Sequence, residues 1–326
     1  MPSWLIKSAT HRAISILPCS QRWNELLQTH VTKSLVFTPA GFSQRLDCCR
    51  IHLEHFFAAS PGREQFTALE LGTGWYPVVP VGLFLCGASE VWTYDIAPLL
   101  QRGRVERTLR AFYEFAADGA LQQRLPWVIP ERLERLREAL ESAATSRTGS
   151  HRALLESLNI HLFVQDARAT GLASASVDLF VSTGVLEYIP RPTLAGLFRE
   201  FRRICVEGAV MCHQIDLSDE FAYFDPSIGA FNFLRYSSRR WKYLDSPIVP
   251  QNRLRISDYR QVISEAGFVI VSETNTDGKE TELAGIRLAP EFQAYSKADL
   301  LVIRSTLVAQ PAPADASSAG APRDEE

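Results

Sequence analysis

The chain has 326 residues, of which 46% are hydrophobic and 22% are charged, and its formal net charge is -3. These values argue against a disordered chain and are typical of a soluble globular protein with one elaborated domain or two small ones. Because the charge is nearly balanced, no broad basic surface attracts phosphates, and we expect no nucleic-acid partner. No apolar run approaches the ~20 residues that a membrane-spanning helix needs, so we expect no membrane insertion.

The hydrophobic pattern predicts helices and strands that alternate along most of the chain. Helices are expected at residues 19–30, 41–59, 192–205 and 258–266, with a further one that begins near Pro77 or Pro80 and ends at Cys86. Strands are expected at residues 68–71, 91–94, 161–165, 177–182, 208–213, 268–272 and 300–304. This alternation predicts an α/β fold, with a doubly wound, mostly parallel seven-stranded sheet and helices on both faces.

Five segments are distinguished by composition. We predict an N-terminal helical region at residues 1–60, an α/β domain at 61–308 and a disordered, low-complexity tail at 309–326. Within the domain, residues 97–159 form a helical insertion that is either a solvated addition or a cover over the ligand site. Residues 216–257 form an aromatic-rich cap, whose rings either line a small-molecule pocket or pack as core.

The cysteines favour a reducing compartment. The six are Cys19, Cys48, Cys49, Cys86, Cys205 and Cys212, and they form neither a C-x-x-C pair nor a metal-ligand spacing. We therefore interpret the chain as a cytoplasmic protein with free thiols and expect no metal site. The basic residues before Glu25 are interpreted as an N-terminal arm rather than a transit peptide.

The most informative motif follows the first predicted strand. Residues 68–77 read Ala-Leu-Glu-Leu-Gly-Thr-Gly-Trp-Tyr-Pro, with Glu70 just upstream of Gly72 and Gly74. A dinucleotide site receives its pyrophosphate on such a turn, and an ionised glutamate there would repel it. Pro77 also stands where the dinucleotide fingerprint has its third glycine. Glu70 therefore argues for a ligand that carries positive charge.

Polar residues end the other predicted strands. They are Asp95, Asp166, Ser182 followed by Thr183, and His213. Ligands of open α/β sheets bind beyond the carboxyl ends of the strands, so these side chains should share one edge with Glu70.

Four motifs in this order resemble those of class I S-adenosylmethionine-dependent methyltransferases, in a divergent form close to the small-molecule enzymes of methyltransferase types 11 and 12. They are residues 69–74 (Leu-Glu-Leu-Gly-Thr-Gly), 94–96 (Tyr-Asp-Ile), 164–167 (Val-Gln-Asp-Ala) and 178–189, which contain Asp-Leu-Phe-Val-Ser and Val-Leu-Glu-Tyr-Ile. The resemblance covers roughly residues 68–216 and 255–271. It implies a Rossmann-like methyltransferase fold with S-adenosyl-L-methionine as cofactor.

The resemblance implies a cofactor role for each strand end. Glu70, Gly72, Thr73 and Gly74 would hold the methionine part of the cofactor, and Asp95 with Ile96 would bind its ribose. Asp166 and Ala167 would face the adenine, and Ser182 and Thr183 would line the sulfonium end. A carboxylate at a strand end can indeed accept two vicinal hydroxyls in charge-assisted hydrogen bonds. The sequence departs from the family where Tyr76 replaces a common glycine and Tyr188 a common histidine.

Methyl transfer from a sulfonium is an in-line displacement that depends mainly on alignment, and a hydroxyl acceptor would also gain from a nearby base. The candidate catalytic residues are His213, Asp216 and Glu187, with His213 either a base or a structural histidine. We expect methylation of oxygen or nitrogen in a small-molecule acceptor. The chain lacks the Asn/Asp-Pro-Pro-Tyr signature of enzymes that methylate a base amine in nucleic acid.

Three other interpretations stay open at this point. The first is transfer of a different group from the same sulfonium, and the second is an NAD(P)-binding Rossmann oxidoreductase. The third is a non-catalytic nucleotide-binding module of the same fold. Nothing in the sequence indicates an oligomeric state.

Overall fold

The computed structural model describes residues 3–17, 23, 25, 36–145 and 150–313. The helix predicted over residues 19–30 lies outside this part of the chain except at residues 23 and 25. Among the described residues, no helix combines the length and apolarity needed to cross a bilayer.

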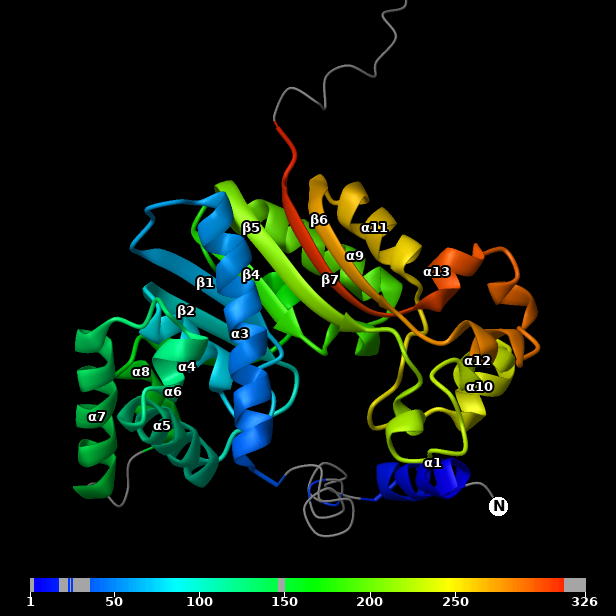
Figure 1. Ribbon diagram of the computed structural model, residues 1–326, viewed down its shortest axis with the longest axis horizontal. Coiled ribbons are helices and arrows are strands. Elements are labelled where there is room, and N and C mark those ends of the chain that lie inside the picture. The colour runs from blue at the N-terminus through cyan, green and yellow to red at the C-terminus, as the bar shows by residue number, and fades with distance from the viewer. Residues whose placement is uncertain (1–2, 18–22, 24, 26–35, 146–149, 314–326) are drawn as a thin grey trace, which may run out of the picture.

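A single sheet forms the centre of the molecule (Figure 1). Its strands are β1 (Phe66–Leu71), β2 (Ala88–Asp95), β3 (Ile160–Val164), β4 (Val177–Thr183), β5 (Cys205–Asp216), β6 (Phe268–Asp277) and β7 (Val302–Pro311). Their order across the sheet is β3-β2-β1-β4-β5-β7-β6. All neighbours pair in parallel except β7, which runs antiparallel to both β5 and β6. The predicted mostly parallel, seven-stranded α/β sheet is confirmed.

The helices cover both faces of the sheet and one end of it (Figure 1). They are α1 (Ser3–Ser15), α3 (Pro39–Ala59), α4 (Val78–Leu85), α5 (Arg102–Ala117), α6 (Ala120–Arg124), α7 (Pro130–Thr145), α8 (His151–Glu156), α9 (Arg191–Ile204), α10 (Ser238–Leu244), α11 (Ile256–Glu265), α12 (Glu280–Ala284) and α13 (Lys297–Leu301). Side chains of α3 to α8 share one core with the sheet, and those of α9 and α11 share a second core on the other face.

Helix α3 shows how local sequence sets these elements. Thr38 caps its first turn, because the Thr38 Oγ1 accepts a hydrogen bond from the Gly41 N–H at 3.0 Å, and Pro39 fits the first helical position. One face then places Phe42, Leu46, Cys49, Leu53 and Phe56 in the core. The predicted helix at 41–59 is confirmed with two further residues at its start.

The predicted insertion contains α5 to α8, and its buried leucines belong to the same core as α3 and α4. It is therefore more than a solvated addition to the sheet. The aromatic-rich segment 216–257 lies beside the carboxyl end of β5, and half of its eight aromatic rings are buried with α1, α12 and α13 in a third core. Those rings are Phe221, Phe231, Phe233 and Trp241. This arrangement favours the core interpretation of the predicted cap.

The last strand differs from its prediction at both ends. Leu300 and Leu301 close helix α13, and β7 begins at Val302 and continues to Pro311. The strand is this long because it pairs with β5 on one side and β6 on the other. Residues 309–311 are thus part of the sheet and not of a disordered tail, and residues 314–326 lie outside the described part of the chain.

Candidate active site

The strand order changes direction between β1 and β4, and this is the point where open α/β sheets bind ligands. Three glycines with left-handed backbone flank it: Gly72 and Gly74 after β1, with φ of 85° and 65°, and Gly184 after β4, with φ of 64°. A Cβ on Gly72 would lie 2.3 Å from Val185 Cγ2, whereas one on Gly74 would meet nothing within 4 Å. The turn is therefore packed at Gly72 and open at Gly74.

Glu70 lies beneath this turn with only 5% of its surface exposed. Its carboxylate accepts a hydrogen bond from Thr93 Oγ1 at 2.6 Å, and the Thr93 hydroxyl also contacts that of Thr73. Burial raises the pKa of Glu70 to about 8, with a smaller contribution from the charge of Asp95. Most Glu70 is thus protonated at pH 7 in this state, which weakens the sequence argument that an ionised Glu70 repels pyrophosphate.

Asp95 joins the end of β2 to the glycine turn. Its Oδ2 accepts a hydrogen bond from the Gly74 N–H and its Oδ1 from the Ala97 N–H, both at 3.0 Å. A carboxylate can accept about four hydrogen bonds, so Asp95 keeps acceptor capacity beyond these two. A cavity of about 240 Å³ adjoins the carboxylate, and residues from the turn, from β3 and from both ends of the insertion line it. Ile96, by contrast, is 86% exposed.

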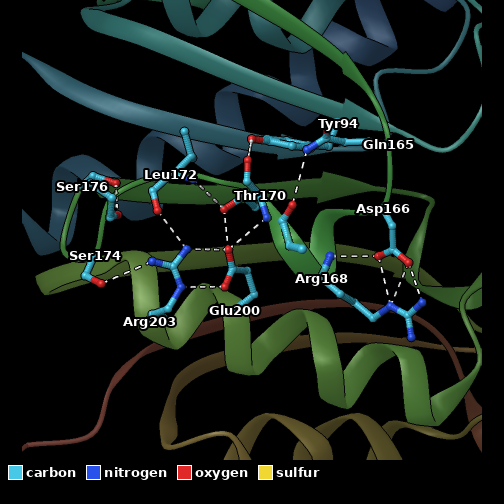
Figure 2. Close-up of polar contacts among 12 residues, drawn as sticks. Tyr94, Gln165, Asp166, Arg168, Thr170, Leu172, Ser174, Ser176, Glu200 and Arg203 are labelled. Atoms are coloured by element: carbon cyan, nitrogen blue, oxygen red, sulfur yellow. Dashed lines mark hydrogen bonds and ion pairs between the residues drawn. The ribbon is translucent and has the colours of Figure 1, made fainter.

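Asp166 and Ala167 follow β3 as predicted, but Asp166 is not among the residues that line the cavity at Asp95. Figure 2 shows the Asp166 carboxylate paired with Arg168 instead. Its carboxylate accepts hydrogen bonds from Arg168 Nε and from the Arg168 N–H, both at 2.9 Å, and these bonds hold its pKa below the usual range. The Arg168 side chain passes over α9 at Gly196, where a Cβ would lie 2.8 Å from Arg168 Cδ. Asp166 is thus paired within its own turn.

Sequence analysis missed a half-buried anchor of the loop after β3. Glu200 on α9 accepts hydrogen bonds from the Thr170 N–H at 3.0 Å and from Arg203 Nη2 at 2.7 Å (Figure 2). On the other side, the Tyr94 hydroxyl donates to the Thr170 carbonyl at 3.0 Å. The loop after β3 is therefore fixed between β2 and α9. An acidic residue on the buried side of an amphipathic helix was the available signal.

Ser182 and Thr183 point to opposite faces of β4, and each meets a buried histidine. Ser182 Oγ lies 2.8 Å from His213 Nδ1, and Thr183 Oγ1 lies 2.9 Å from His52 Nε2. Burial lowers the pKa of both histidines to about 3, so both are neutral at pH 7. Because the side chains of Ser182 and Thr183 are hydrogen-bonded to these histidines, a ligand would contact mainly the backbone of the two residues.

His213 is only 1% exposed and packs against Phe198 and Phe201 of α9. Sequence analysis expected it to project from the carboxyl edge, and the structure corrects this placement. The His213 side chain points from β5 into the core that the sheet shares with α9. This burial favours the structural role for His213 over the role of a base, which must reach its acceptor.

The other two catalytic candidates do lie together at the edge. Glu187 follows β4 in the turn Leu186–Tyr188, and Asp216 ends β5. Glu187 is 4% exposed, and its Oε2 has no hydrogen-bond partner in the described structure. Burial raises the pKa of Glu187 well above its ordinary value, and the charges of Asp216 and Glu220 raise it further. Glu220, four residues after Asp216, is the third carboxylate of this group.

Tyr76 and its neighbours close the outer side of the glycine turn. The Tyr76 ring lies 5.0 Å from that of Phe37, so this residue packs as core where the family has a glycine. The Arg104 guanidinium lies 4.6 Å from the Trp75 ring and 2.6 Å from Glu25. Helix α5, together with Glu25 and Phe37, thus braces the turn from outside.

Within the described residues, no group of three or more His, Cys, Asp or Glu side chains is arranged to hold a metal ion. The carboxylates, the open space beside Gly74 and the adjoining cavity suit an organic ligand.

Residues 133–212, about a quarter of the chain, match the family model described as a methyltransferase domain. No curated protein sequence matches. Among solved structures, a putative sarcosine dimethylglycine methyltransferase from Galdieria sulphuraria is 13% identical, with 81% of this chain and 85% of that chain covered and a TM-score of 0.42.

Two further solved structures are similar at the same level. The geranyl diphosphate C-methyltransferase from Streptomyces coelicolor A3(2) is 12% identical, with coverage of 81% and 78% and a TM-score of 0.43. The magnesium protoporphyrin IX methyltransferase from Synechocystis PCC 6803 is 12% identical, with coverage of 84% of each chain and a TM-score of 0.41. The family-model match, taken with the observed strand order, supports the assignment of this chain to the class I S-adenosylmethionine-dependent methyltransferases.

Proposed function

We propose that this protein transfers the methyl group of S-adenosylmethionine to an oxygen or nitrogen atom of a small molecule. The observation that carries the proposal is the set of three left-handed glycines at the switch point, with the Asp95 carboxylate beside the open one. Bound there, S-adenosylmethionine would supply an activated methyl group on its sulfonium.

The residues present fit this cofactor. Gly74 leaves room that a Cβ would take, and Asp95 has free lone pairs at a cavity wall, as a ribose diol requires. Glu70 lies beneath the turn, and a nearby ammonium group would favour its ionised form. The protein's own task is then to hold the donor and acceptor in line and to keep water out.

Titration calorimetry with S-adenosylmethionine tests the proposal. Asp95→Asn keeps the shape of the side chain but removes its charge, and it should weaken binding by about tenfold or more. Asp277→Asn, at the exposed end of β6 on the far edge of the sheet, is the matched control and should bind as the wild type does. Equal affinity of the Asp95 variant and the wild type would reject the assigned ribose site.

A further inference from the structure

Asp166, which the family resemblance assigns to the adenine of the cofactor, is engaged elsewhere. Its carboxylate pairs with Arg168 (Figure 2), and the next residue in line, Ala167, is buried. The chain then turns toward α9, where Glu200 accepts a hydrogen bond from the Thr170 N–H. The loop after β3 therefore does not present the carboxylate that the resemblance expects at the base.

The cavity beside Asp95 extends from the glycine turn to β3. It has a volume of about 240 Å³, and its lining includes Gly74 at one end and Leu162 and Val164 of β3 at the other. The strand order β3-β2-β1 sets the direction of a bound ligand. A cofactor with its amino-acid part at Gly74 and its ribose at Asp95 has its base next to β3. Pockets for whole drug-sized ligands measure about 300–1,000 Å³, so this cavity suits one part of a ligand.

The wall that β3 supplies is apolar. Leu162 is buried, but Val164, at the carboxyl end of the strand, keeps 41% of its surface exposed. Leu100 adds a further buried apolar side chain to the lining. A flat aromatic base that packs against Val164 would remove this apolar surface from water.

The opposite wall is polar and comes from the insertion. Ser150 caps α8, since its hydroxyl accepts a hydrogen bond from the Arg152 N–H at 3.1 Å, and this cap orders the backbone of His151 at the cavity. Partial burial and the charge of Arg152 lower the pKa of His151, so its imidazole is neutral at pH 7. A neutral imidazole has one donor and one acceptor. Adenine likewise carries an amino donor and ring-nitrogen acceptors.

We propose that the adenine of S-adenosylmethionine binds in this cavity, between Val164 of β3 and His151 at the start of α8. This proposal rests on the proposed methyltransferase function. It makes residues 97–159 part of the cofactor site, because the insertion supplies the polar contact to the base that Asp166 does not. His151 is then a residue that recognises the base, rather than one that takes part in methyl transfer.

Calorimetric titration of the full chain with S-adenosylhomocysteine and with methylthioadenosine tests this site. Both ligands contain adenosine, and only the first has an amino-acid part. The variants are His151→Ala, which removes the imidazole, and Val164→Trp, which fills the space for the base. His55→Ala removes a half-buried histidine of α3 that does not line the cavity, and it is the matched control. Asp166→Asn distinguishes this site from the placement that the family resemblance implies.

We expect His151→Ala to weaken binding of both ligands by about threefold to tenfold, and Val164→Trp to weaken it by more than about tenfold. His55→Ala and Asp166→Asn should bind both ligands as the wild type does. Thermal melts identify which variants are folded, and two separate variants keep the test valid if one of them is not.

Unchanged affinity in a folded His151 or Val164 variant would overturn the base site, as would a tenfold loss in Asp166→Asn. A loss for S-adenosylhomocysteine but not for methylthioadenosine would also overturn it, because His151 would then act on the amino-acid part. In each of these cases the wild type still binds S-adenosylhomocysteine, and the proposed function stands. No binding of S-adenosylhomocysteine to the wild type would instead contradict the proposed function itself.

Discussion

The Asp95 carboxylate accepts a hydrogen bond from the backbone N–H of Gly74, with 3.0 Å between Oδ2 and N. This bond joins the end of β2 to the turn after β1, so one carboxylate both shapes the glycine turn and borders the cavity beside it. Its position depends on the parallel pairing of β1 with β2, which brings residues far apart in sequence to one edge.

Glu70→Gln tests the buried carboxylate beneath the turn. The folded-state pKa of Glu70 is about 8 against an ordinary value of 4.5, so the native state binds more protons and wild-type stability falls as the pH rises through this window. The variant cannot titrate, and its free energy of unfolding should exceed that of wild type by about 3–5 kcal/mol at pH 8 and by little at pH 4. Denaturant unfolding across this range provides the measurement, with exposed Glu64→Gln as control. Parallel stability curves for Glu70→Gln and wild type would refute the raised pKa.

Gly72→Ala and Gly74→Ala separate backbone strain from a steric clash. Both positions have left-handed backbone, which costs about 1–2 kcal/mol for a residue with a Cβ. Only at Gly72 would the Cβ also clash with Val185, so Gly72→Ala should be the more destabilising of the two. The additional Val185→Ala change should recover part of the loss for Gly72→Ala but none for Gly74→Ala. Urea unfolding of the four variants measures these energies, and equal losses for the two glycines would contradict the packed contact.

Glu200→Ala removes the anchor of the loop after β3. The Thr170 N–H and Arg203 lose their acceptor, which should cost about 1–3 kcal/mol of stability. The loop between β3 and β4 should also become more sensitive to limited proteolysis. Glu207→Ala, on an exposed part of β5, should change neither quantity. A loop that stays equally resistant in the Glu200 variant would show that its other hydrogen bonds, from Tyr94 to Thr170 and from Arg203 to Leu172, hold it without Glu200.

His213→Asn keeps a polar atom near Ser182 but removes the titrating ring. The folded-state pKa of His213 is about 3 against 6.5, so its contribution to stability is present above pH 6.5 and is lost as the pH falls toward 3. Wild type should lose about 2 kcal/mol more than the variant between pH 6.5 and pH 5. Guanidinium unfolding at the two pH values checks this. An unchanged acid dependence would mean that His213 is more accessible to protons than its packing indicates.

The sequence predicted the strands, their polar ends and the glycine turn because each depends on local pattern. Hydrophobic runs placed β1 to β5 near their true positions, and glycine with an acid marked the turn after β1. The antiparallel insertion of β7 between β5 and β6 depends on long-range pairing, which no local pattern specifies.

Side-chain direction was harder to predict than position. Ser182 stands near the end of β4 as expected and His213 lies three residues before the end of β5, yet both point into the core, because alternation along a strand decides the face. Glu70 is likewise in place, but its protonation depends on burial that the sequence does not reveal. The partnerless oxygen of Glu187 emerges only when β4, β5 and the segment after β5 are assembled.

The central claim is that the turn after β1 and the end of β2 bind S-adenosylmethionine. Calorimetric titration of the wild-type chain with S-adenosylmethionine and, separately, with NAD under the same conditions tests it most directly. We predict saturable binding of S-adenosylmethionine, tighter than that of NAD by about tenfold or more. Tighter binding of NAD, or no binding of S-adenosylmethionine, would contradict the account.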